Sequence, residues 1–426
     1  MMNIELDYQT IKKYYDETLN KNRDLVQTSN DEPTPIDCVE EMISKIPEEF
    51  WMKEDIKILD PCCGYGNFPL VVYYKLLKYH NKSHILNNIL YFNDLNEERL
   101  EILRQVFQDD DKDETKNIVL NIEQSDFLEY DVGIKFDLIM ANPPYAKLLK
   151  NGKRASKNHN MIGVFISHSF EILKENGYLL YITPDNWMSF ADRNTLILKL
   201  TEKQIHYINI HIAKKYFKKI GSSFVWYLIE NTSSYKDIEV EGIWKKQLYK
   251  SNVKSEIRRY IPLYYNSTIH SILSKTVDKQ NKKFIVETSS DLHKYTKRNL
   301  ISSTKDDKHI YKLIHTPSQT VWAERPHKFQ EGYKVFISTT SYYKTFVDNC
   351  GMTQSILFIR CESEEQAQKY AKVLMHPLYV FINNICRYGN FNNIRILQRF
   401  PICEDYNSVY ESFDISPEEI DFIEKN

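Results

Sequence analysis

The most specific chemical signal in the 426-residue sequence is the tetrapeptide Asn142–Pro143–Pro144–Tyr145, which follows the apolar run at residues 136–140. The prolines fix the backbone φ angles, and the carbonyl groups before them cannot join a regular hydrogen-bond ladder. The side-chain oxygen of Asn142 and the carbonyl oxygen of Pro143 could therefore both accept hydrogen bonds from one exocyclic amine. Tyr145 offers a flat ring on which a base can stack. A turn without any chemical role is the alternative.

A turn that contains two glycines lies upstream at residues 60–68 (DPCCGYGNF), directly after the apolar run 56–59. Gly64 and Gly66 permit a tight turn and let the backbone approach a bound ligand closely. Asp60 stands at the end of the apolar run, where its carboxylate could accept a hydrogen bond from a cationic amine. Two glycines at this spacing also occur in loops that bind nothing, but their position between a strand and a helix favours a ligand-binding turn.

Two further acidic positions follow apolar runs that we expect to form strands. Asp94 comes after residues 89–92, where a carboxylate suits the hydroxyl groups of a ribose, although a helix N-cap explains it equally well. Asp126 and Phe127 come after residues 118–122. An acid beside an aromatic ring fits the amino group and the ring of adenine, and the alternative is a turn whose Phe lies in the core.

The hydrophobic pattern of residues 34–235 alternates between short apolar runs and helical periodicity, which indicates a doubly wound, mostly parallel α/β sheet. The expected strands are residues 56–59, 89–92, 118–122, 136–140 and 178–182, and the expected helices are residues 36–46, 70–77, 97–107 and 165–173. Residues 206–212 and 224–229 are expected to close the sheet as a late antiparallel pair. Since the pattern becomes irregular beyond about residue 232, we divide the chain into an N-terminal helical extension (1–33), an α/β domain (34–235) and a C-terminal mixed α+β domain (236–426).

The composition narrows the class of protein. The net charge is -2, but residues 1–140 hold 15 basic and 29 acidic residues, whereas residues 141–403 hold 40 basic and 21 acidic ones. A basic region of this size suggests a nucleic acid as partner, and a solvated basic surface is the alternative. We see no long apolar run and no secretory signal, so we expect a cytoplasmic protein without a membrane span. The seven cysteines form no CxxC pair, so we expect reduced thiols and no metal.

In their order along the chain, the glycine turn, the strand-end acids and the Asn-Pro-Pro-Tyr turn resemble the motifs of the S-adenosylmethionine-dependent DNA adenine-N6 methyltransferases. The gamma subgroup of that family has the cofactor motifs first, then the catalytic motif and then a target recognition domain, and the resemblance covers about residues 30–230. It implies a Rossmann-like methyltransferase sheet, S-adenosyl-L-methionine as cofactor and S-adenosyl-L-homocysteine as product. It also implies a type II restriction-modification-like enzyme that acts on an adenine flipped out of double-stranded DNA.

The resemblance assigns roles to the matched residues. The implied catalytic residues are Asn142, Pro143, Pro144 and Tyr145, with Phe217 stacking on the target base opposite Tyr145. Around the cofactor, Thr34, Pro35 and Asp60 are implied at the methionine end, Asp94 at the ribose, and Asp126 with Phe127 at the adenine. The other implied cofactor-binding residues are Cys62, Gly64, Gly66, Phe68 and Asn142. Cys62 stands where the family commonly has a small residue such as Ala, and Tyr65 is bulkier than the usual residue.

Basic residues near the catalytic turn and in the C-terminal domain are candidates for contacts with DNA phosphates. We predict such contacts for Lys150, Lys153, Arg154, Lys215, Lys218, Lys219, Arg387 and Arg395. Further candidates for contact with DNA are Lys294, Lys297, Arg298, Tyr342, Tyr343, Lys344, Tyr388 and Arg399. Ordinary surface loops would account for the same residues.

Other functions share parts of this pattern. The Asn-Pro-Pro-Tyr turn also serves methyltransferases that act on RNA or on a protein glutamine, and a nucleic-acid binder with an inactive pocket is a third alternative. Nearly 200 residues follow the α/β domain, which favours a large anionic polymer as substrate. Because no PD…(D/E)xK nuclease motif is found, we expect methylation without cleavage. Any restriction endonuclease would then be a separate protein, and we expect a monomer.

Overall fold

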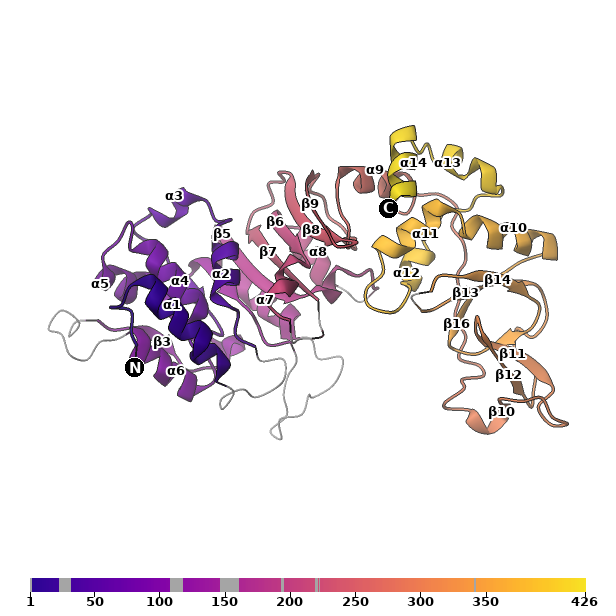
Figure 1. Ribbon diagram of the computed structural model, residues 1–426, viewed down its shortest axis with the longest axis horizontal. Coiled ribbons are helices and arrows are strands. Elements are labelled where there is room, and N and C mark those ends of the chain that lie inside the picture. Colours follow the sequence, from indigo (N-terminus) through magenta and orange to yellow (C-terminus); the bar gives the residue numbers. More distant parts are fainter. Residues whose placement is uncertain are drawn as a thin grey trace. The chain divides into compact units, whose positions relative to one another are not determined.

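The computed structural model describes residues 2–22, 32–107, 118–145, 161–192, 195–218, 221, 223–340 and 342–426 (Figure 1). The chain divides into two compact units, one formed by Met1–Asp185 with Leu198–Ile257 and the other by Asn186–Ile197 with Arg258–Asn426. In the described part of the chain, no helix is both long enough and apolar enough to cross a membrane.

A nine-stranded sheet with the strand order β3-β2-β1-β4-β5-β7-β6-β8-β9 forms the centre of the first unit. Its strands are β1 (Ile58–Asp60), β2 (Leu90–Asn93), β3 (Asn121–Glu123), β4 (Phe136–Ala141), β5 (Leu173–Pro184), β6 (Gln204–Ile210), β7 (Phe224–Glu230), β8 (Ile238–Trp244) and β9 (Gln247–Val253). Strands β3, β2, β1, β4 and β5 are parallel to one another, and β7 runs antiparallel to both β5 and β6. The structure confirms the predicted doubly wound, mostly parallel sheet and its late antiparallel pair.

Helices cover both faces of this sheet, and residues 138–141 of β4 and 179–182 of β5 are accordingly buried and carry no charge. The helices of the first unit are α1 (Tyr8–Glu17), α2 (Ile36–Ile43), α3 (Glu48–Trp51), α4 (Asn67–Leu76), α5 (Lys82–His84), α6 (Glu97–Phe107) and α7 (Met161–Ile172), while α8 (Leu196–Thr201) spans the boundary between the units. Leu180 and Ile182 of β5 join a core cluster with α1, α2, α4 and α6. Since neighbouring side chains of a strand point to opposite faces, Tyr181 faces the other side, where its hydroxyl lies 2.7 Å from that of Ser169 in α7.

The first unit extends beyond the range of the predicted α/β domain at both ends. Strand β8 pairs in parallel with β6, and a hairpin whose turn residues Lys245 and Lys246 have positive φ angles leads into β9. At the N-terminus, Ile11 and Tyr15 of α1 are fully buried in the core cluster of the sheet. Two strands from the range 236–426, and the helix from the range 1–33, therefore belong to this unit.

The second unit has a mixed α+β structure, as predicted, with two small sheets of strand order β10-β12-β11-β15 and β14-β13-β16. The strands are β10 (Ile301–Ser302), β11 (Tyr311–Thr316), β12 (Gln319–Ala323), β13 (Lys334–Ser338), β14 (Thr345–Asp348), β15 (Gly351–Met352) and β16 (Ile356–Arg360). The helices are α9 (Ser267–Lys275), α10 (Glu364–Leu374), α11 (Pro377–Ile385), α12 (Ile394–Leu397), α13 (Val409–Ser412) and α14 (Pro417–Lys425).

Candidate active site

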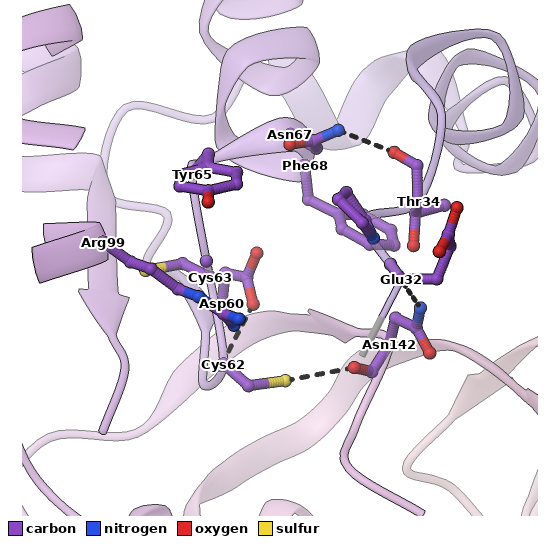
Figure 2. A pocket seen from close by; sticks show the side chains of 12 residues that line it. Glu32, Thr34, Asp60, Cys62, Cys63, Tyr65, Asn67, Phe68, Arg99 and Asn142 are labelled. Carbon is purple, nitrogen blue, oxygen red and sulfur yellow. Dashed lines mark hydrogen bonds between the residues drawn. The ribbon is translucent and has the colours of Figure 1, made fainter. Parts of the chain in front are cut away.

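A pocket lies at the carboxyl ends of the parallel strands β1 and β4, which are direct neighbours in the sheet (Figure 2). Ligands of doubly wound sheets bind in the crevice outside these strand ends. The space between its lining residues is about 510 Å³, which includes space open to solvent. The described residues that line it are Glu32, Pro33, Thr34, Asp60, Cys62, Cys63, Gly64, Tyr65, Asn67, Phe68, Arg99 and Asn142.

The two glycines of the turn between β1 and α4 have different surroundings. Both have positive φ angles, +55° at Gly64 and +86° at Gly66, in the left-handed region that favours glycine. A Cβ atom added to Gly64 would meet no described atom within 4 Å, whereas one added to Gly66 would lie 3.0 Å from the ring of Phe107 and 3.2 Å from Leu103. Gly64 therefore leaves space for a ligand, and Gly66 leaves space for the side chains of α6.

Asp60 ends β1 as a carboxyl group that is only 2% exposed. One of its oxygens accepts a hydrogen bond from the backbone N–H of Cys62 at 3.2 Å. Burial raises the pKa of Asp60 well above its usual value; the Cys62 N–H opposes that rise, and the negative charge of Asp94 adds to it. A cation in the pocket would offset both the burial and the repulsion between the two acids.

Asp94 holds the glycine turn from the end of β2. Its Oδ2 atom accepts the N–H of Gly64 at 2.8 Å, and its Oδ1 atom accepts the N–H of Asn96 at 2.9 Å. The residue is 7% exposed and is not among the lining residues. These contacts fix the glycine turn to the end of β2. The binding of ribose hydroxyl groups by Asp94 stays a prediction.

Asn93, which the sequence analysis did not single out, ties three strand ends together. Its Nδ2 atom donates to the carbonyl oxygens of Pro61 at 3.0 Å and Ser125 at 3.2 Å, and its Oδ1 atom accepts the Ser125 hydroxyl at 2.9 Å. Its backbone carbonyl accepts the N–H of Cys63 at 2.9 Å. The signal available in the sequence was an amide residue directly after the apolar run 89–92. In the structure, Asn93 is only 1% exposed.

The Asn142 side chain lies at the pocket, directly after β4. Its Nδ2 atom donates to the carbonyl oxygen of Glu32 at 3.2 Å, and its Oδ1 atom accepts the Tyr145 hydroxyl at 2.7 Å. The thiol of Cys62 donates to the Asn142 carbonyl oxygen at 3.5 Å (Figure 2). The glycine turn and the Asn-Pro-Pro-Tyr turn, which are about 80 residues apart in sequence, are thus joined at one site.

The two aromatic residues predicted to stack on a target base, Phe217 and Tyr145, both contact the ring of Phe224. Phe217 is 2% exposed and stacks on Phe224, with ring centroids 4.5 Å apart. Tyr145 is half-buried, and its ring centroid lies 6.2 Å from that of Phe224. Because a base can stack only on an exposed ring face, the stacking role of Phe217 requires a local rearrangement and stays a prediction.

The upstream wall of the pocket comes from residues around Thr34. Asn67, the first residue of α4, donates to the carbonyl oxygen of Thr34 at 2.8 Å and to the side chain of Asn20 at 3.0 Å. The Tyr15 hydroxyl of α1 donates to the carbonyl oxygen of Tyr65 at 2.7 Å. The hydroxyl of Thr34 is buried and has no hydrogen-bond partner among the described residues. This wall therefore offers a donor to a bound molecule.

The structure brings only part of the predicted cofactor set to the pocket. The predicted residues that line it are Thr34, Asp60, Cys62, Gly64, Phe68 and Asn142, and those that do not are Pro35, Gly66, Asp94, Asp126 and Phe127. Asp126 is exposed and caps a short helix at Leu128, and Phe127 packs in the core on Phe165. The lining residues that the sequence analysis did not place there include Glu32 and Arg99, which lie outside the short motifs. Asn67 also lines the pocket, and it lies within the motif at residues 60–68, where no role was assigned to it.

The predicted DNA-contacting residues have varied surroundings. Lys215 pairs with Glu41 at 2.8 Å, and Arg395 of the second unit pairs with Asp192. Lys218 is exposed, and Arg387 is half-buried. Lys150, Lys153, Arg154 and Lys219 lie outside the described residues. Among the residues that the structure does describe, no three His, Cys, Asp or Glu side chains are grouped so that they could hold a metal ion.

The strand order, the glycine turn after β1 and the pocket beside it define a Rossmann-like fold of the methyltransferase type. Residues 42–217, about two fifths of the chain, match the family described as "Eco57I restriction-modification methylase". This match confirms the resemblance to restriction-modification methyltransferases. It includes the glycine turn, Asn142 and Phe217.

Individual relatives agree with this family but are matched over limited lengths. The "Type II methyltransferase M.VspI" of Vibrio sp. (strain 343) is 27% identical over 168 residues, which cover 37% of this chain and 38% of the relative. A second type II methyltransferase, from Thermus thermophilus, is 31% identical over 90 residues, which cover 17% of this chain and 21% of the relative. The matched stretches thus span well under half of these relatives.

Two solved structures share the fold at low sequence identity. The DrdV–DNA complex has a TM-score of 0.56 and 12% identity, and the likeness covers 98% of this chain and 59% of that one. The type IIL restriction-modification enzyme MmeI, in complex with DNA, has a TM-score of 0.52 and 10% identity, and the likeness covers 92% of this chain and 73% of that one.

Proposed function

We propose that this protein is a site-specific DNA methyltransferase that transfers a methyl group from S-adenosyl-L-methionine to the N6 amine of adenine in double-stranded DNA. The observation that carries the proposal is that Asn142 and Asp60, from two different strand ends, line one pocket. The family of residues 42–217 supports a role in a restriction-modification system. The two solved structures with the same fold, which were determined as DNA complexes, support DNA as the partner.

The residues of the pocket fit the proposed cofactor. Asp60 is a buried acid with a raised pKa and suits a cationic amino group. The buried Thr34 hydroxyl lacks a partner among the described residues, and Gly64 faces open space where a side chain would intrude. When bound, the cofactor would supply an electrophilic methyl group on a sulfonium.

The part played by the chain is to position the amine and to favour its attacking form. An adenine inside a duplex must first be flipped out, at a cost of a few kcal/mol. Asn142 Oδ1 and the Pro143 carbonyl would then accept hydrogen bonds from the two amine hydrogens, which favours a pyramidal nitrogen with a free lone pair. An amide oxygen has two lone pairs, so Oδ1 can accept from the amine and still accept from the Tyr145 hydroxyl. Placing nitrogen and methyl within contact distance supplies much of the rate.

The experiment that tests this function is incubation with radiolabelled S-adenosyl-L-methionine and mixed duplex DNA, followed by nucleoside analysis and mapping of the methylated sites. We expect label in N6-methyladenine at a defined sequence. Parallel incubations with RNA and with protein test the two alternative substrates. Label only in RNA or only in protein would exclude the proposed function.

Cofactor affinity is expected to fall as the pH is lowered, because Asp60 must be ionised to pair with a cationic amino group. Its raised pKa places the loss of charge above the normal range of an aspartate, and below that pKa the affinity should fall by up to about tenfold per pH unit. Isothermal titration calorimetry between pH 5 and 8 measures this dependence. Asp60→Asn should bind weakly with a flatter profile, while Asp55→Asn, at an exposed acid before β1, should resemble the wild type. A wild-type profile in Asp60→Asn would remove Asp60 from the cofactor site.

The exposed Lys218 and the paired Lys215 form a matched test of phosphate contact. Lys218→Ala should weaken duplex binding and lower the slope of log K against log salt by about 0.9, the value for one lost phosphate contact. Lys215→Ala should change binding less, because Glu41 already neutralises this ammonium group. Fluorescence anisotropy at several salt concentrations measures both slopes. The reverse order of effects would show that Lys215 leaves Glu41 for the DNA.

A further inference from the structure

Two loops of the second unit meet and present two exposed aromatic rings. The first loop follows β13 and is described at residues 339, 340 and 342–344, and the second loop, residues 387–393, joins α11 to α12. Tyr342 in the first loop is 73% exposed, and Phe391 in the second is 65% exposed. Thr340 and Phe391 form an isolated β-bridge, so the loops are directly paired. We call this paired element the aromatic tip.

Asn392 clamps the two loops of the aromatic tip together. It is only 7% exposed, and its Nδ2 atom donates to the carbonyl oxygens of Ser338 at 2.9 Å and Thr340 at 2.7 Å. Its backbone N–H donates to the carbonyl oxygen of Thr339 at 2.9 Å. Its Oδ1 atom accepts a hydrogen bond from the buried Asn383 of α11 at 3.0 Å. A single buried residue of the second loop therefore satisfies three carbonyl groups at the start of the first loop and links both loops to α11.

The first loop is also closed at its base. The Ser338 hydroxyl accepts the N–H of Lys344 at 3.0 Å and donates to the carbonyl oxygen of Tyr342. Beside Tyr342, the neighbouring Tyr343 is buried, at 8% exposure. One ring thus anchors the loop while the next points into solvent. The hydrogen bonds of Ser338 hold the backbone at Tyr342 and Lys344. The side chain of Tyr342 is therefore exposed on a loop whose backbone is well held.

The charges around the aromatic tip indicate an anionic partner. Residues 339–344 and 387–399 contain Lys344, Arg387, Arg395 and Arg399 but no acidic residue, and residues 258–403 as a whole hold 22 basic and 11 acidic residues. Arg395 pairs with Asp192, and Arg399 lies over the ring of Phe190 at 5.5 Å, so these two arginines also hold the surrounding structure. Exposed rings among basic side chains are the combination that proteins use to contact bases beside phosphates.

We propose that the aromatic tip is a DNA-contacting element in which Tyr342 and Phe391 pack directly on bases of the duplex, with Asn392 as the residue that positions them. The inference rests on the proposed function, since it takes double-stranded DNA as the partner. It specifies which residues of the second unit contact the DNA bases, namely two aromatic residues, and which residue positions them. Aromatic and apolar side chains that wedge between base steps provide the physical precedent.

The test uses the full chain and the duplex found to be methylated by the wild type. Tyr342→Ala and Phe391→Ala should each weaken binding of that fluorescently labelled duplex by roughly 5- to 150-fold, the effect of losing one base–aromatic stack. Binding of S-adenosyl-L-methionine should not change. Ile285→Ala is the matched control, because Ile285 is a large apolar side chain of the same unit that is also 73% exposed, and it should bind DNA as the wild type does.

Asn392→Ala separates positioning from direct contact. It should raise the KM for DNA with little change in kcat, and its effect should shrink when Tyr342 and Phe391 are already alanine, because coupled residues are not additive. Equal losses in both backgrounds, or a fall in kcat alone, would contradict the positioning role.

If the wild type methylates DNA while both aromatic variants bind it as Ile285→Ala does, the inference fails and the proposed function stands. If the wild type modifies no DNA, the proposed function itself fails.

Discussion

Asn142→Ala is expected to lose at least about 10²- to 10³-fold in kcat for methyl transfer to DNA, the size of effect seen when one preorganised transition-state hydrogen bond is removed. The variant lacks the side-chain oxygen that would accept the target amine. The affinity for the cofactor should stay close to that of the wild type, because Asn142 is only one of the twelve described residues that line the pocket. Single-turnover transfer of a labelled methyl group and calorimetric cofactor binding measure the two effects separately.

Two conservative variants show which atom of the site matters. Asn142→Asp keeps the oxygen but loses the Nδ2 donor that contacts Glu32, and it should retain part of the activity. Tyr145→Phe removes the hydroxyl that occupies one lone pair of Oδ1 but keeps the ring, so its kcat should change by less than about tenfold, within the contribution of one ordinary hydrogen bond. Full activity in Asn142→Ala would eliminate the proposed acceptor.

Alanine replacements of the two glycines should have distinct consequences. Gly66→Ala should lower the free energy of unfolding by about 2–5 kcal/mol, because a left-handed alanine is strained by about 1–2 kcal/mol and overpacking against Phe107 and Leu103 costs about 1–3 kcal/mol more. Gly64→Ala should cost only the backbone strain, since its Cβ atom meets open space. Its main effect should be a loss of cofactor affinity.

Thermal unfolding and cofactor titration of the same two variants distinguish these effects. A destabilisation of 1 kcal/mol corresponds to about 2–4 °C in the unfolding temperature for a domain of 150–250 residues. Gly66→Ala should unfold at the lower temperature, and Gly64→Ala should bind the cofactor more weakly. If Gly64→Ala were the less stable variant and bound the cofactor normally, the ligand would not lie against this part of the turn.

The sequence alone was enough to predict the order of the elements in the α/β region and most of the pocket residues that lie in short motifs. Glu97–Phe107 is a helix with the predicted bounds, and the strands that end at Asp60 and Ala141 lie within a few residues of the prediction. Local rules suffice there, because an apolar run followed by a glycine turn or by two prolines has few folded alternatives.

The sequence predicted the contacts of single residues less well, because a contact depends on groups from distant segments. The sequence did not indicate that Glu41 pairs with the ammonium group of Lys215. It also did not indicate that Phe217 stacks on Phe224, and the predicted DNA and base contacts of these two residues stay predictions. The pattern also gave no sign that α1 supports the glycine turn through the Tyr15 hydroxyl.

By itself, the sequence determined that a glycine turn and an Asn-Pro-Pro-Tyr turn occur in a fixed order, each after an apolar strand, with Asp60, Gly64 and Asn142 as candidate pocket residues. Only the tertiary structure decided that β1 and β4 are neighbours, that Asn93 ties three strand ends together, and that Gly66 accommodates α6 instead of a ligand. The physical reason is that the residue types at a strand end can be identified from a short stretch of sequence. The space around each side chain is instead set by packing between segments that are far apart in sequence.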